Sequence, residues 1–166
     1  MDLLVGFITL CLATILQNTL VVRFNLLNGA ADLVLLVLIT WILHENSKAH
    51  WQMSTIAGFI IGFSSKLPVW ITLIGYLIVM YVIHQLMKHI WQAPLLLLFF
   101  ITLVSSVIIL SIDYLYLVLF GAKLPFWNTF NLVILPGTVL NLLFVLPVYA
   151  VVGEVARILY PPAVEL

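Results

Sequence analysis

Charged residues are scarce in this chain, and their scarcity excludes several classes of protein. Only 7% of the 166 residues are charged, six basic and six acidic, and 65% are hydrophobic. A soluble domain carries about 25% charged residues, so this chain cannot cover the surface of a water-soluble globule. Disorder requires high charge and few aromatic residues, whereas aromatic residues make up 13% here. Because the formal net charge is zero, the basic face of a nucleic-acid-binding protein is also excluded.

Cysteine and the common catalytic motifs are equally sparse. The single cysteine, Cys11, excludes a disulfide framework within the chain and a cysteine-based zinc site. The sequence has no Gly-x-Ser-x-Gly elbow, no phosphate-binding glycine loop and no His-Glu-x-x-His helix. Its carboxylates are scattered singly, so no close pair in the sequence suggests acid–base chemistry. We therefore expect a protein that is not an enzyme, with no catalytic residues, no cofactor and no metal site.

Long uncharged runs between the few charges predict membrane-spanning helices, since roughly 20 apolar residues cross about 30 Å of hydrocarbon. Pro68, Pro94 and Pro136 each suit the first turn of a helix, where the missing N–H costs nothing. Residues 124–135 are expected to form an interfacial segment before the last helix. The predicted fold is an all-α integral membrane protein, a single multi-pass domain. It forms one bundle of about six transmembrane helices, over residues 3–22, 30–44, 51–65, 68–88, 94–120 and 136–160.

Small residues form a stripe on the third predicted helix. Ser54, Gly58 and Gly62 recur every four residues, and the two glycines make a Gly-x-x-x-Gly motif. In lipid, apolar surface does not drive helices together, because lipid tails are as apolar as leucine, whereas small residues permit close approach of two backbones. The stripe therefore predicts either packing within this bundle or a docking face for a helix of another protein.

Polar residues inside the predicted spans form a second group of candidates. Gln17, Asn18 and Asn141 are costly in hydrocarbon unless they have partners, so we expect them at contacts between helices. Asp32 lies at the start of the second helix, where a carboxylate caps free N–H groups and interacts favourably with the helix dipole.

Asp113 lies near the far end of the fifth predicted helix, and its role is open at this stage. Its carboxylate could be solvated, could pair with Lys66 or Lys123, or could face another protein.

Several short motifs follow one another in an order typical of one protein family. They are LQNT at 16–19, GAADLVLL at 29–36, GFIIG at 58–62, GY at 75–76, LPGTVLN at 135–141 and LPVY at 146–149. With these motifs the chain resembles, over nearly its whole length, the bacterial rod shape-determining protein MreD family. It departs from the family at Ala31, where proline is usual, and at Lys66, where aspartate is common.

The resemblance implies a non-enzymatic subunit of the cell-elongation machinery in the bacterial cytoplasmic membrane. It implies a six-helix fold similar to the substrate-binding components of energy-coupling-factor transporters. The implied partners are MreC, the polymerase RodA, a class B penicillin-binding transpeptidase and, indirectly, the MreB filament. The bundle would dock the transmembrane helix of MreC, help regulate the peptidoglycan synthase and so control cell shape. The candidate helix-packing or partner-interface residues are Ser54, Gly58, Gly62, Gln17, Asn18, Asp32, Pro136 and Asn141.

Two other functions compete with this one. The first is a small-molecule-binding component of an energy-coupling-factor transporter. Such components tend to carry an Ala-x-x-x-Ala motif on the first helix, where this chain offers only Ala13. A vitamin that co-purifies with the chain would favour this function. The second is a small intramembrane enzyme, which the missing catalytic motifs disfavour.

Overall fold

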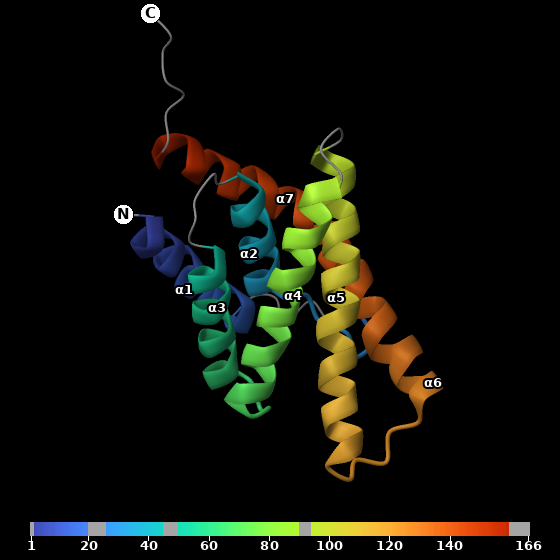
Figure 1. The fold of residues 1–166 in the computed structure, drawn as a ribbon. Helices are drawn as coiled ribbons and strands as arrows, with labels where there is room; N and C mark the ends of the chain where they lie inside the picture. Colours follow the sequence, from blue (N-terminus) through green and yellow to red (C-terminus); the bar gives the residue numbers. More distant parts are fainter. Residues whose placement is uncertain (1, 20–25, 45–49, 90–93, 160–166) are drawn as a thin grey trace, which may run out of the picture.

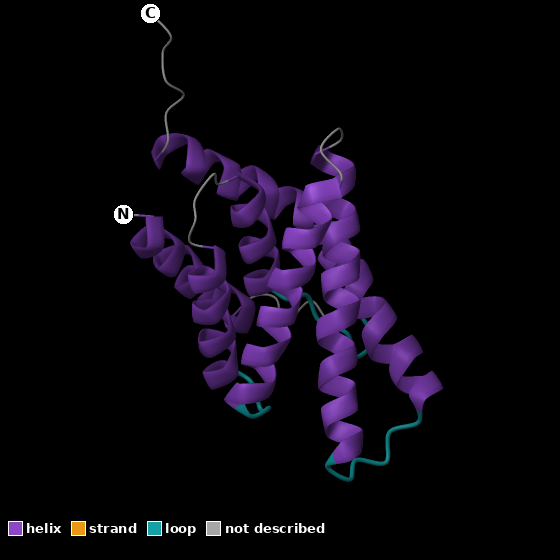
Figure 2. Ribbon diagram, in the orientation of Figure 1, coloured by secondary structure: helices purple, strands orange, loops and turns teal. Residues whose placement is uncertain are grey.

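The described part of the chain is helical throughout. The computed structural model describes residues 2–19, 26–44, 50–89 and 94–159, and the statements below concern these residues. They contain helices joined by short turns and no strand (Figure 2). Six long helices form the fold: α1 (Asp2–Thr19), α2 (Leu33–His44), α3 (His50–Ser64), α4 (Val69–His89), α5 (Pro94–Leu119) and α7 (Leu135–Leu159). The short α6 (Phe126–Thr129) and a π-helical turn, η2 (Phe130–Ile134), precede α7.

Three helical segments are long and apolar enough to cross a membrane. They are Val69–Lys88, Leu95–Leu119 and Phe126–Arg157. Two shorter apolar helical segments, Leu3–Thr19 and Leu33–Leu43, accompany them. Large apolar side chains are exposed on the three long segments and on Leu3–Thr19, but not on Leu33–Leu43. Such exposure is expected for a bundle whose surroundings are lipid rather than water. The all-helical class predicted from the sequence is confirmed for the described residues.

Most helix boundaries lie close to those predicted from the sequence. Pro94 is the first residue of α5, and Pro68 immediately precedes α4. The second helix begins at residue 33 rather than 30, because Asp32 caps its N-terminus from outside the helix. The predicted helix residues 20–22 and 160 lie outside the described residues.

The last long helix, α7, begins at Leu135, within one residue of the prediction, and Pro136 lies in its first turn. What the prediction did not contain is the helical structure before it: α6 and η2 run directly into α7, so residues 124–135 are mostly helical rather than a separate interfacial segment. The whole helical segment, Phe126–Arg157, has 32 residues. Proline has no N–H to give to the carbonyl of Leu132 one turn earlier. That carbonyl instead accepts the backbone N–H of Asn28, at 3.0 Å, beside the π-helical turn.

The turn that leads into α2 packs closely on this π-helical region. Leu26 and Gly29 exchange backbone hydrogen bonds of 3.1 and 2.9 Å, and Leu27 between them has a left-handed φ of 57°. A Cβ on Gly29 would overlap the backbone of Gly137 and would lie 2.9 Å from the carbonyl carbon of Pro136. Glycine is therefore required at position 29 for the turn to approach α7.

The core of the bundle surrounds α2. This helix contacts α1, α3, α5 and α7, and its side chains from Val34 to Ile42 are buried. The other strong contacts are between α3 and α4, between α4 and α5, and between α5 and α7. With 12 residues against 26, α2 is less than half the length of α5, and Figure 1 shows it alongside only the upper part of α5. The N-terminus of α2 therefore lies inside the bundle.

Candidate functional site

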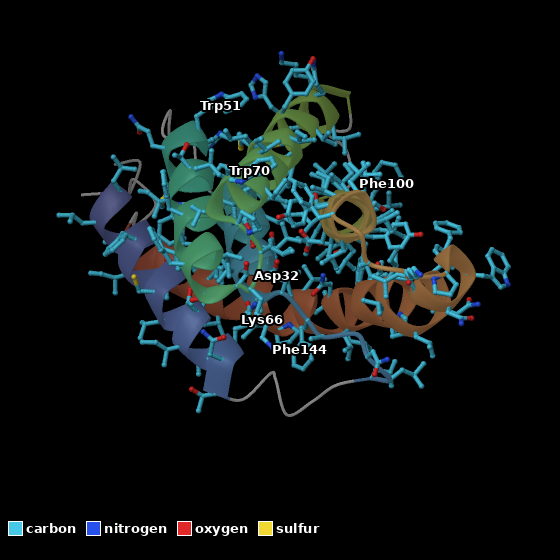
Figure 3. The ribbon with its side chains drawn as sticks, turned by 90° about the horizontal axis from the view of Figure 1, so that it is seen from below. Asp32, Trp51, Lys66, Trp70, Phe100 and Phe144 are labelled. Carbon is cyan, nitrogen blue, oxygen red and sulfur yellow. The ribbon has the colours of Figure 1, made fainter. Side chains whose placement is uncertain are left out.

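Asp32, at the N-terminus of α2, makes hydrogen bonds to three separate parts of the fold. Its Oδ1 atom accepts the backbone N–H of Leu35 at 3.0 Å, which caps the helix. Its Oδ2 atom accepts the hydroxyl of Tyr76 from α4 at 2.9 Å. Its own backbone N–H donates to Oδ1 of Asn141 from α7 at 2.7 Å. Asp32 thereby joins α2, α4 and α7, and Figure 3 shows it among the helices in the view from below.

Three further hydrogen bonds extend this set to the remaining long helices. Nδ2 of Asn141 donates to Oγ of Ser106 from α5 at 2.8 Å. The backbone N–H of Val34 donates to Oε1 of Gln17 from α1 at 3.2 Å. Oγ of Ser54 from α3 donates to the backbone carbonyl of Tyr76 at 2.7 Å. We call these residues the Asp32 network: Gln17, Asp32, Ser54, Tyr76, Ser106 and Asn141.

The Asp32 network lies deep in the bundle. Ser54, Ser106 and Asn141 are at most 2% exposed. Ser106 is the thirteenth of the 26 residues of α5, so it lies about 18 Å from the start of that helix at 1.5 Å per residue. Placing a polar side chain halfway along an apolar helix costs free energy. In membrane proteins, residues of this kind often belong to functional sites. We therefore take the network as the candidate functional site.

The small-residue stripe of α3 faces α4. A Cβ on Gly58 would lie 2.9 Å from Cα of Leu73, and a Cβ on Gly62 would lie 2.9 Å from Cα of Val69. Ser54, one turn earlier, makes the hydrogen bond to α4 described above. Of the two roles that the sequence left open for this stripe, the structure shows packing within the chain. A helix from another protein cannot use the same face while α4 occupies it.

Two of the polar residues singled out in the sequence lie outside the network. Asn18 is exposed and makes no hydrogen bond in the described part of the chain. Asp113 forms no ion pair with Lys66 or Lys123, because the one ion pair among the described residues joins Arg157 and Glu154.

Sequence reasoning missed two members of the network. Tyr76 appears in the sequence only as part of a short motif, and Ser106 as one of many serines in apolar runs. The one available signal for Ser106 was its place, with Ser105, at the centre of the longest apolar helix.

An apolar groove lies between α1, α2 and α7. Its volume is about 370 Å³. The side chains that line it are almost all aliphatic or aromatic, and they include Leu12, Leu16, Leu33, Phe144, Pro147 and Val151. Such a surface can accept apolar partners.

The described residues offer a buried hydrogen-bonded network and an apolar groove. No group of three or more His, Cys, Asp or Glu side chains among them could hold a metal ion by itself. The hydrogen bonds of the network fix the depth and rotation of six helices relative to one another. Comparison with protein-family models, with curated proteins and with solved structures finds no match to this chain.

Proposed function

We propose that this chain is an MreD-type subunit of the bacterial cell-elongation complex. In this proposal it crosses the cytoplasmic membrane with six helices, in an arrangement like that of the substrate-binding components of energy-coupling-factor transporters. It is not an enzyme. It docks the transmembrane helix of MreC, and thereby helps regulate the peptidoglycan synthase formed by RodA and a class B penicillin-binding transpeptidase. Its link to the MreB filament is indirect.

The observation that carries the proposal is the convergence of the motif residues on one place in the fold. Gln17, Asp32 and Asn141, from three of the motifs, belong to the hydrogen-bonded Asp32 network. Tyr76, from a fourth, donates to Asp32. Gly58, from a fifth, lies against the helix segment that carries Tyr76. Short motifs that matched an apolar sequence by chance would have no reason to meet, so their contact supports a single shared architecture.

The geometry also supports a scaffold role. Large apolar side chains cover the outside of the bundle, and the polar groups of the Asp32 network are paired inside it. A rigid apolar surface of this kind can pack against transmembrane helices of other subunits. A partner shifts an equilibrium between two states only if it binds one state more tightly than the other. This subunit would therefore regulate the synthase if, in its presence, MreC binds one state of the synthase complex more tightly than another.

Co-purification from membranes tests the proposal. The tagged chain is expressed with the MreC, RodA and class B transpeptidase of the same genome, extracted in mild detergent and captured. We expect MreC to be retained, with RodA and the transpeptidase recovered through it or beside it. Capture of the folded chain without MreC, also after crosslinking in intact membranes, contradicts the proposal. A tightly bound vitamin in the purified chain would favour the transporter component instead.

A pair of matched variants maps the docking face in the same experiment. Val151→Trp fills the apolar groove from α7, and Leu96→Trp alters the outer face of α5. The two side chains are similarly exposed, at 65% and 62%. Loss of MreC with Val151→Trp alone places its helix at the groove, whereas loss with Leu96→Trp alone places it on α5.

A further inference from the structure

The apolar groove between α1, α2 and α7 opens on the outside of the bundle. Helices α1 and α7 both pack against α2, and Val37 of α2 is buried between them. Leu12 of α1 and Val151 of α7, on opposite sides of the groove, are 54% and 65% exposed. In a chain that spans a membrane, such an opening faces the hydrocarbon of the lipids.

One end of the groove lies at the level of the Asp32 network. Leu33 follows Asp32 directly, and Phe144 follows Asn141 by three residues, nearly one turn of α7. The network lies halfway along α5, so this end of the groove is near the middle of the bundle. From Phe144 to Val155 the groove follows α7 for about 17 Å, at 1.5 Å per residue. That length matches one leaflet, which is half of the roughly 30 Å hydrocarbon core.

The groove is narrow for its length. A volume of about 370 Å³ spread over that length gives a channel about 5 Å across. A single hydrocarbon chain fits such a width, because carbon atoms in contact lie about 3.5–4.0 Å apart. An α-helix with its side chains is about 10–12 Å across, and a transmembrane helix of a partner would extend through both leaflets. The dimensions therefore favour a lipid chain over a helix.

The lining of the groove offers almost nothing to a polar ligand. Thr9 is the one polar residue among the described residues that line it. The Thr9 hydroxyl already donates to the backbone carbonyl of Gly6, at 2.8 Å. Burying a polar group without a hydrogen-bond partner costs free energy, so a vitamin or a lipid head group is disfavoured here. A plain hydrocarbon chain meets no such cost.

We propose that this groove binds one acyl chain of a membrane phospholipid. The lipid belongs to the leaflet at which α1 begins and α7 ends, both in the upper part of Figure 1. Its chain extends along α7 from the level of Val155 to that of Phe144, while its head group and its second chain stay in the bilayer. The bound chain joins α1 to α7 across α2. The proposal rests on the membrane location in the proposed function and not on the binding of MreC.

Native mass spectrometry of the full chain tests the site. The chain is reconstituted into nanodiscs of palmitoyl-oleoyl phosphatidylethanolamine and phosphatidylglycerol, transferred to a neutral maltoside detergent and washed until loosely bound lipids are removed. We expect one phospholipid to remain bound per chain. Phosphatidylcholine with the same acyl chains should be retained equally, because the groove binds no head group. Dioctanoyl lipids should be retained severalfold less, because their chains fill only part of the groove.

Two variants and a matched control locate the lipid. Val151→Trp and Leu12→Trp fill the groove from opposite sides, and each should lower lipid retention severalfold. Leu96→Trp, at a residue of α5 that is 62% exposed, should leave retention unchanged. A diazirine at the end of the acyl chain should crosslink near Phe144, and a diazirine beside the ester should crosslink near Val155.

Three results of these experiments overturn the proposal: no retained lipid in the original chain, equal retention in all three variants, or retention that follows the head group rather than the chain length. Lipid retention that MreC abolishes would also overturn it, because the groove would then hold the MreC helix. If one tryptophan variant fails to fold, the other variant and the chain-length series decide. Lipid retention without any recovery of MreC supports the lipid site and contradicts only the proposed function.

Discussion

The close contact between α3 and α4 predicts opposite outcomes for the same substitution at two glycines. Gly58 faces backbone, since an added Cβ would lie 2.9 Å from Cα of Leu73. Gly75 faces only the ends of two isoleucine side chains, at 3.8 and 3.9 Å. Both glycines are buried inside helices. Gly58→Ala and Gly75→Ala therefore change helix propensity equally and differ only in what the new methyl group meets.

The magnitude follows from that difference. Two carbon atoms in favourable contact lie about 3.5–4.0 Å apart, so Gly58→Ala must move α4 away by roughly 0.6–1 Å. Overpacking of this kind costs about 1–3 kcal/mol, whereas alanine is favoured over glycine inside a helix by up to about 1 kcal/mol. We expect Gly75→Ala to be neutral or stabilising. We expect the free energy of unfolding of the Gly58→Ala variant to be about 1–3 kcal/mol lower than that of the Gly75→Ala variant. In the Gly58→Ala background, adding Gly62→Ala should lower the free energy of unfolding less than Gly62→Ala does in the original chain. The same displacement of α4 accommodates both methyl groups.

Reversible unfolding in mixed micelles of maltoside and dodecyl sulfate, followed by circular dichroism, measures these differences. The Ser54–Tyr76 hydrogen bond of 2.7 Å spans the same interface, so Gly58→Ala should also make Ser54→Ala less costly than it is in the original chain. If Gly58→Ala proves as stable as Gly75→Ala, the close contact between Gly58 and the backbone of α4 does not exist. The small-residue stripe of α3 could then bind a helix of another protein.

Two further predictions concern the polar residues. Asn141→Ala leaves a buried N–H and a buried hydroxyl without partners, and it should lower the free energy of unfolding by about 2 kcal/mol or more. The same change at exposed Asn18 is its control, with an expected effect within about 0.5 kcal/mol; equal effects would contradict the network. Pro136→Ala restores an N–H that competes for the carbonyl of Leu132, so amide hydrogen exchange at Asn28 should become faster. Unchanged exchange at Asn28 would mean that this carbonyl does not depend on the proline.

The helices themselves could be predicted because their signals are local. Runs of apolar residues bounded by charges and prolines placed α3, α4 and α5 within one residue at each end. The four-residue spacing of the small residues on α3 also indicated a close helix contact. What the spacing could not show was the partner, because backbone approach by α4 and approach by another protein require the same glycines.

The remaining features depend on contacts between distant residues. Local rules placed Pro136 correctly in the first turn of the last helix, but they did not show that helical structure precedes it. There the Leu132 carbonyl accepts the backbone N–H of Asn28, 104 positions earlier (132 − 28). Asp32 was expected to cap α2, but its bonds to Tyr76 and Asn141 join segments 44 and 109 positions away. Sequence periodicity carries no information about pairs at such separations.

The short length of α2 explains why the Asp32 network is needed if the chain spans a membrane. Twelve helical residues extend about 18 Å, well short of the roughly 30 Å of a hydrocarbon core. Irregular backbone is tolerated at that depth only where protein satisfies its polar groups. The structure meets this condition, because Asp32 and Gln17 accept N–H groups of the first turn of α2, and Asn28 donates to α7. The network therefore explains how a half-length helix can occupy the centre of an apolar bundle, and why its loss should affect insertion and folding before it affects any partner.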